Sequence, residues 1–263
     1  MENIQKINEN IYRMTLPYKD IFTTVYLIKT EEGALLFDAA SYDEDIPEYL
    51  IPFLNKLGIT KNELKYVFIS HNHKDHAGGL AAFMNEYPKT CIISGSDALM
   101  DTYKDCKFLI PSENETVLGV LKVIKIPGHT KDSAGILDMR TNTLISGDSL
   151  QLYGIFGSGK WAANISFTEE HFKAIDKLRN MDIEMVLTAH DYHPYGYMYC
   201  GKEKISQALD ACINPLLNIK EIILNNPEAD DDKVCEIYNS AENLPTLGPA
   251  AVKGMREFIK KER

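Results

Sequence analysis

The spacing of hydrophobic residues over the first 190 positions predicts strands that alternate with helices. Runs of β-branched and aromatic residues at 21–28, 34–37 and 66–70 are typical of strands. Residues 45–57 instead place hydrophobic side chains on one side at helical spacing, and Gly58 ends that pattern. Further strands are expected near 91–93, 121–126, 136–137, 143–145 and 185–187, and further helices near 78–86 and 169–179. This alternation indicates an α/β layered fold.

After about residue 200 the pattern becomes wholly helical. Hydrophobic residues keep three-and-four spacing over 205–217 through Pro215, which predicts a helix that the proline can kink. Two more helices are expected near 233–238 and 250–261. We therefore expect two parts, a domain at residues 1–200 and a helical segment at residues 201–263 that packs on it.

Composition and charge narrow the class of protein. Hydrophobic residues make up 44% and charged residues 25% of the 263, which is ordinary for a globular chain. No apolar run reaches the roughly 18 residues that a membrane span requires. The first residues lack a signal-peptide pattern and the five cysteines form no Cys-x-x-Cys pair, so we expect reduced thiols and a cytoplasmic location. A net charge of −10 disfavours a nucleic-acid partner.

Three of the seven histidines lie in one hexapeptide, His71-Asn72-His73-Lys74-Asp75-His76. It begins where the predicted strand at 66–70 ends, and sites in α/β proteins usually lie at the carboxyl ends of strands. Neutral imidazoles and a carboxylate are ligands that suit zinc, iron or manganese. Three histidines crowded together without a metal would repel one another whenever they were protonated. The hexapeptide therefore predicts a metal site.

Three further candidate ligands each follow a predicted strand. They are His129 after 121–126, Asp148 after 143–145 and His190 after 185–187. A lone histidine at such a position is more often structural, but together with the hexapeptide the three strand ends favour convergence on one edge of a sheet. The other two histidines, His171 and His193, are not expected to bind metal. His171 is expected among exposed charges on the helix at 169–179.

The order of these residues resembles the five motifs of the metallo-β-lactamase superfamily. The matching residues span about 10–200 and are Asp38, His71-x-His73-x-Asp75-His76, His129, Asp148 and His190. The resemblance implies an αββα sandwich, here with a C-terminal helical appendage, and two metal ions at one edge of the sheets. It assigns one metal to His71, His73 and His129, and the other to Asp75, His76 and His190, with Asp148 bridging both. It also implies that Asp38 is a structural carboxylate that supports the histidine loop.

The residues at individual motif positions indicate which branch of the superfamily the chain resembles. Asp148 stands where the common antibiotic-hydrolysing members carry cysteine, so the chain resembles the hydroxyacylglutathione hydrolases, lactonases and thioesterases. His73 stands where the flavin-linked di-iron oxygen reductases carry glutamate. Hydroxyacylglutathione hydrolases usually continue the third motif as Gly-His-Thr-x-Gly-His. Here the run is Gly128-His129-Thr130-Lys131-Asp132-Ser133, which argues against that specific activity.

Aromatic residues in two loops are candidates for a substrate pocket. Tyr18 and Phe22 lie between two early strands, and Tyr153, Phe156 and Trp161 lie beyond Asp148. Packing within the protein is an equally good interpretation of both sets.

A basic face recurs at three-and-four spacing on the last helix, formed by Lys253, Arg256, Lys260 and Arg263. It is either an anchor for an anionic substrate group or a solvated face whose cations complement the helix C-terminus.

Together these residues predict a dinuclear metal-dependent hydrolase that cleaves a small acyl substrate, a thioester, lactone or ester. A metal-bridging hydroxide would attack the carbonyl, and Asp75 would orient it and pass its proton to the leaving group. Zinc is the expected metal, with iron or manganese as alternatives. Two other activities stay open on the same motifs: a phosphodiesterase or ribonuclease, and a mononuclear-iron sulfur dioxygenase. The expected partner is a small molecule rather than nucleic acid or a membrane, and a homodimer is left open.

Overall fold

The computed structural model describes residues 3–19, 21–152, 154–156, 159–192, 196–242 and 247–262, without the side chains of 154–156, 159–161 and 242. The chain divides into two compact units, Met1–Ile124 and Lys125–Arg263. The boundary that we expected near residue 200 separates the strand-containing part from the final helices. It does not coincide with the boundary between these two units, and it stays a prediction.

The first unit contains a seven-stranded sheet in the order β1-β2-β3-β4-β5-β6-β7. Its strands are β1 (Ile4–Lys6), β2 (Ile11–Tyr18), β3 (Ile21–Thr30), β4 (Gly33–Phe37), β5 (Leu64–Ile69), β6 (Cys91–Ser94) and β7 (Phe108–Leu109). The first four pair antiparallel, and β4 to β7 pair parallel. The residues that follow β4 and β5 therefore lie at the same edge of this sheet.

Helices of the first unit supply the other side of its core. They are η1 (Ile46–Leu50), α1 (Ile51–Lys56), α2 (Lys74–Ala77), α3 (Leu80–Glu86) and α4 (Asp97–Thr102). Val67 and Ile69 of β5 are fully buried in one hydrophobic cluster with Phe53 of α1 and Phe83 of α3. The helices expected at 45–57 and 78–86 are thereby confirmed.

A second, six-stranded sheet has the order β15-β14-β11-β10-β9-β8. Its strands are β8 (Thr116–Val117), β9 (Leu121–Lys125), β10 (Ala134–Asp138), β11 (Thr143–Ile145), β14 (Met185–Tyr192) and β15 (Gly196–Cys200), and a separate pair is formed by β12 (Gly154–Phe156) and β13 (Gly159–Trp161). The expectation that a strand ends at 187 is wrong. The strand continues to Tyr192 through a register irregularity, so His190 lies within β14 rather than after it.

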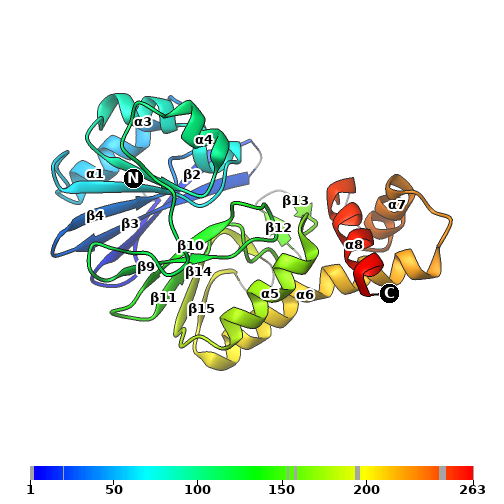
Figure 1. The fold of residues 1–263 in the computed structure, drawn as a ribbon. Coiled ribbons are helices and arrows are strands. Elements are labelled where there is room, and N and C mark those ends of the chain that lie inside the picture. The colour runs from blue at the N-terminus through cyan, green and yellow to red at the C-terminus, as the bar shows by residue number, and fades with distance from the viewer. Residues whose placement is uncertain are drawn as a thin grey trace. The chain divides into compact units, whose positions relative to one another are not determined.

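Four helices complete the second unit: α5 (Thr168–Arg179), α6 (Lys202–Asn225), α7 (Asp231–Glu242) and α8 (Pro249–Glu262). The helix α6 runs through Pro215. Figure 1 shows α7 and α8 beside the C-terminal part of α6. Leu216 of α6, Val234 of α7 and Val252 of α8 are buried in one cluster with Ile165, which precedes α5. The final helices therefore share a core with the segment before α5.

In the described part of the chain, no helix has both the length and the apolar character needed to cross a bilayer. All five cysteines are free thiols. Cys200 is exposed and Cys212, on α6, is buried. The cytoplasmic location stays a prediction.

Candidate metal centre

The histidine loop begins at the carboxyl end of β5. His71 is buried there, and His73 has the extended backbone of a helix N-cap before the single turn of α2. The backbone N–H of His76 donates to the carbonyl of His73 at 3.1 Å, which closes the turn. This turn returns His76 to the interior while His73 stays exposed.

Asp38 supports this loop from the end of β4. Its side chain is fully buried, and its Oδ2 lies 2.7 Å from Nδ1 of His76. It also accepts from the backbone N–H of Ser70 at 2.8 Å and from the Ser70 hydroxyl at 3.0 Å. Burial raises the pKa of the Asp38 carboxyl above its usual value, and the neighbouring His76 partly offsets the rise. The supporting role expected for Asp38 is confirmed by these contacts.

Three of the histidines share one arrangement, in which Nδ1 has a protein partner. His76 has Asp38, His71 has the Ser70 hydroxyl at 3.1 Å, and His129 has the carbonyl of Asn164 at 2.7 Å. A carbonyl only accepts, so Nδ1 of His129 carries the proton and Nε2 presents its lone pair. Metal-binding histidines in proteins almost always have such a partner on the second nitrogen.

Asp148 presents its two carboxylate oxygens to different histidines. Oδ1 lies 3.3 Å from Nε2 of His190, and Oδ2 lies 3.9 Å from Nε2 of His129. All three side chains are buried. A carboxylate placed in this way has the geometry to bridge two cations.

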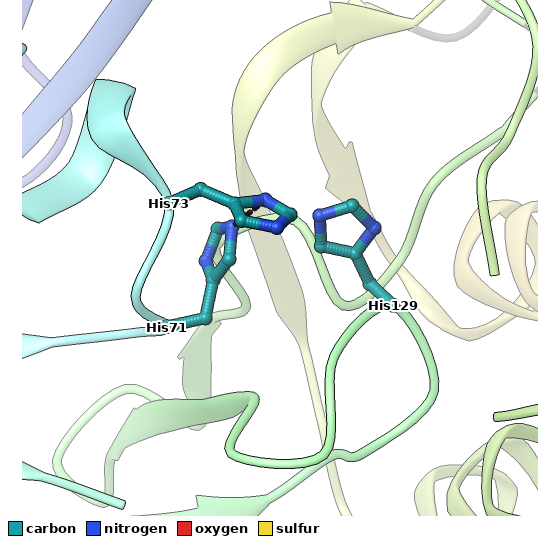
Figure 2. Close-up of side chains that lie close together, drawn as sticks. All are labelled: His71, His73 and His129. Carbon is teal, nitrogen blue, oxygen red and sulfur yellow. Dashed lines mark hydrogen bonds between the residues drawn. The ribbon is translucent and has the colours of Figure 1, made fainter. Parts of the chain in front are cut away.

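The seven predicted ligands fall into two groups. The ligand atoms of His71, His73 and His129 all lie within 4.8 Å of one another, and so do those of Asp75, His76, Asp148 and His190. Figure 2 shows the rings of the first three histidines close together. Two donors on one tetrahedral cation, each about 2.1 Å from it, are about 3.4 Å apart. Nε2 of His71 lies 3.0 Å from Nδ1 of His73, and Nε2 of His76 lies 3.4 Å from Oδ2 of Asp75.

The nitrogen and oxygen donors therefore fit two divalent cations. Each predicted ligand belongs to one of the two groups, and metal binding by these residues stays a prediction.

Thr23 is a residue of the site that the sequence did not reveal. Its hydroxyl donates to the backbone carbonyl of Asp75 at 2.7 Å, so β3 holds α2 in place. Nothing in the sequence pattern marks a threonine in a strand as the partner of a backbone carbonyl.

The aromatic residues expected around a substrate are only partly described by the structure. Tyr18 is half-buried, with its ring 5.9 Å from the ring of Tyr42. Phe22 is half-buried, and the Cζ atom of Arg13 lies 5.7 Å from the centroid of its ring. Tyr153 and the side chains of Phe156 and Trp161 lie outside the described residues, and so does His193. The role of these aromatic residues in binding substrate stays a prediction.

The expectation that His171 lies among exposed charges is wrong. His171 is completely buried on α5, on the face that also carries Ala174, Ile175 and Leu178. Burial lowers the pKa of His171 from 6.5 to about 4. Hydrophobic residues three, four and seven positions later placed it on the buried face, and this signal was present in the sequence. His171 belongs to neither group of ligand atoms.

The basic face of the last helix is partly neutralised. Arg256 pairs with Asp231 at 2.8 Å and also donates to the carbonyl of Ala229. Lys253 and Lys260 are exposed, and Arg263 lies outside the described residues. This arrangement weakens the face as an anchor for an anionic substrate group.

Comparison with protein families gives a match over residues 18–190 to the model described as the metallo-beta-lactamase superfamily. The protein YobT of Bacillus subtilis is 31% identical over 164 residues, which cover 52% of this chain and 67% of YobT. A hydroxyacylglutathione hydrolase of Synechococcus is 29% identical, over 64% of this chain and 63% of the relative. An N-acyl homoserine lactonase of a Bacillus species is 25% identical, over 65% of this chain and 74% of the relative. Several curated relatives are matched over less than two thirds of their own length.

Solved structures share the fold at low sequence identity. A metallo-beta-lactamase family protein of Thermus thermophilus superposes with a TM-score of 0.67 at 15% identity, over 98% of this chain and 95% of the other. The DIM-1 metallo-beta-lactamase gives a TM-score of 0.61 at 19% identity, over 80% and 96%. The expected fold class, with two sheets, flanking helices and C-terminal helices, is confirmed.

Proposed function

Because the chain belongs to the metallo-β-lactamase superfamily, we propose that it is a dinuclear metal-dependent hydrolase of a small acyl substrate, a thioester, lactone or ester. The observation that carries the proposal is the presence of two groups of candidate ligands, seven residues in all. The Asp148 carboxylate lies near one histidine of each group. Relatives named as a hydroxyacylglutathione hydrolase and a lactonase support an acyl substrate.

His71, His73 and His129 would hold one cation, Asp75, His76 and His190 the other, and Asp148 both. A pair of divalent cations lowers the pKa of a coordinated water and polarises an acyl carbonyl. Zinc is the proposed metal because it accepts this mixture of imidazole and carboxylate ligands, and iron and manganese accept it as well. The chain's contribution is to fix the ligands, through the partners on Nδ1 of His71, His76 and His129.

Asp75 is the proposed proton carrier. Its side chain is 15% exposed, so solvent and substrate reach a carboxylate oxygen that the fold otherwise holds still. The Thr23 hydroxyl fixes the backbone of Asp75, and His76 lies 3.4 Å from its Oδ2. A carboxylate held in this way accepts a proton from the attacking water and returns it to the leaving thiolate or alkoxide.

The acyl substrate class is favoured over nucleic acid by charge. A net charge of −10 lowers the on-rate and affinity for an extended polyanion. We propose that the protein acts on small molecules, in the cytoplasm.

A substrate panel tests the proposal. Protein purified without added metal is first analysed for zinc, iron and manganese, and is then assayed on thioesters, lactones, β-lactams, cyclic phosphodiesters and single-stranded RNA. We expect close to two metal ions per chain and the highest kcat/KM on a thioester or lactone, lost on chelation and restored by metal. A kcat/KM on RNA or phosphodiesters far above that of every acyl substrate would replace this proposal with the nuclease alternative.

A further inference from the structure

Asn164 lies between β13 and α5, and all four of its hydrogen-bonding groups have partners. Its carbonyl accepts from Nδ1 of His129 at 2.7 Å. Its backbone N–H donates to Oε1 of Gln151 at 2.9 Å, and its side-chain amide donates to the carbonyl of Ala162 at 3.2 Å. Its Oδ1 accepts from the backbone N–H of Gly248 at 2.8 Å. An asparagine engaged at every polar group has one orientation available to it.

Gln151 links this residue to a second predicted ligand. While Oε1 accepts from Asn164, Nε2 of the same side chain donates to Oδ2 of Asp148 at 3.2 Å. The Gln151 side chain is 8% exposed. One buried amide therefore connects the support of His129 with the carboxylate of Asp148.

Gly248 connects the same residues to the final helices. It immediately precedes α8, and the preceding Leu247 donates its N–H to the Asn239 side chain of α7 at 3.0 Å. Leu247 is buried in the cluster that contains Ile165, next to Asn164 in sequence. The position of the Asn164 backbone thus depends on the packing of α7 and α8.

We propose that Asn164 and Gln151 are positioning residues through which the C-terminal helices set the affinity of the metal centre. Asn164 fixes the ring of His129, and Gln151 fixes both the Asn164 backbone and the Asp148 carboxylate. Loss of a partner in the outer shell of a metal site typically lowers metal affinity about 10–100-fold. The proposal rests on the metal centre proposed above.

The two residues should have different effects. Asn164→Ala removes the bonds to Gly248 and Ala162 but leaves Gln151 on Asp148. The backbone carbonyl that contacts His129 is retained but loses its tie to Gly248, so the variant should weaken the cation held by His71, His73 and His129 more than the other, by up to about 10-fold. Gln151→Met keeps the length of the side chain and removes both of its bonds, so it should weaken both cations. Asn164→Asp keeps an acceptor for Gly248 and should recover part of the affinity.

The experiment measures Zn²⁺ affinity by competition with a chromophoric chelator in the full-length protein. Co²⁺ substitution and visible absorption report the coordination geometry, and urea unfolding of the metal-free variants reports the fold. Asn55→Ala and Gln207→Met are the matched controls, because both residues are exposed and lie outside these bonds. We expect the controls to match the wild type, with changed Co²⁺ spectra only in the Asn164 and Gln151 variants.

The outcomes separate the two proposals. A wild-type chain that binds neither Zn²⁺ nor Co²⁺ in these measurements would overturn the metal centre itself. Two wild-type ions with unchanged affinity and Co²⁺ spectra in Asn164→Ala and Gln151→Met would overturn only the positioning role. Loss of affinity in proportion to lost stability of the metal-free chain would likewise assign both residues to folding alone.

Discussion

A Cβ atom added to Gly128 would lie 2.6 Å from Nδ1 of His171. Gly128 precedes the predicted ligand His129, and its carbonyl accepts from the backbone N–H of Phe167 at 2.8 Å. The loop that carries His129 therefore lies directly against the start of α5, at a separation that leaves no room for a side chain. The backbone of Gly128 also has a φ of +156°, a conformation that glycine adopts more readily than other residues.

Gly128→Ala should destabilise the protein by steric overlap with His171. Overpacking of a rigid interior typically lowers the free energy of unfolding by about 1–3 kcal/mol, and urea unfolding of the metal-free protein measures it. Gly58→Ala is the matched control, because Gly58 also has a positive φ, +69°, but nothing lies within 4 Å of its added Cβ. Gly58→Ala should lower the free energy of unfolding by less, about 1 kcal/mol. Equal losses at the two glycines would contradict the steric explanation.

His171 should make stability depend on pH. Burial lowers its pKa from 6.5 to about 4, so between these values the unfolded chain binds a proton that the folded chain excludes. The free energy of unfolding should therefore fall as the pH falls from 6.5 towards 4, by at most about 1.4 kcal/mol per pH unit from this residue.

Urea unfolding of the chelator-treated wild type and of His171→Gln, at several pH values, measures this dependence. The glutamine variant should show a shallower slope below pH 6.5, because all other ionisable groups are common to the two proteins. Parallel slopes would show that His171 binds its proton equally well in the folded chain.

Asp148→Asn should lower the number of bound metal ions. The change removes a negative charge from a carboxylate that lies 3.3 Å from His190 and 3.9 Å from His129. We expect metal content, measured by elemental analysis after dialysis, well below that of the wild type, with hydrolysis reduced in parallel. Asp176→Asn makes the same chemical change on the exposed side of α5 and should leave both unchanged. Two ions per chain in Asp148→Asn would exclude a bridging role.

Asp75→Asn should reduce turnover more than metal content. The variant loses the carboxylate proposed to carry the proton, which should lower kcat about 100-fold or more. His71, His73 and His129 should still retain one ion. Asp97→Asn is the control, because Asp97 also lies in the first turn of a short helix, α4, but is exposed and belongs to neither group of candidate ligands. An unchanged kcat in Asp75→Asn would remove this residue from the mechanism.

The candidate ligands could be picked out from the sequence because much of their signal is local, and metal binding by them stays a prediction. His71, His73, Asp75 and His76 lie within six residues, and their order with the later candidates His129, Asp148 and His190 matches the motifs of one superfamily. The fold followed from the same resemblance and from the alternation of strands and helices. The extent of β14 could not be predicted from its hydrophobic run, because the strand continues past Leu187 through polar residues and an irregular register.

The supporting residues could not be predicted for a different reason. Asn164 contacts His129 through a backbone carbonyl, which every residue type possesses, and Thr23 holds Asp75 through the same kind of group. Such contacts leave no pattern in side-chain type or spacing. His171 differs, because its place on the apolar face of α5 could have been read from the sequence.

The buried thiol of Cys212 on α6 allows local opening of the structure to be measured chemically. Only a thiolate reacts with alkylating reagents, and burial both covers Cys212 and raises the pKa of its thiol. The backbone of Cys212 is a hydrogen-bond partner of His171 on α5, and because the Cys212 residue is buried, a reagent reaches its sulfur only when the surrounding structure opens. Cys200, exposed at the end of β15, reacts without any such opening. The ratio of the two alkylation rates, corrected for their thiolate fractions, therefore gives the free energy of local opening around Cys212.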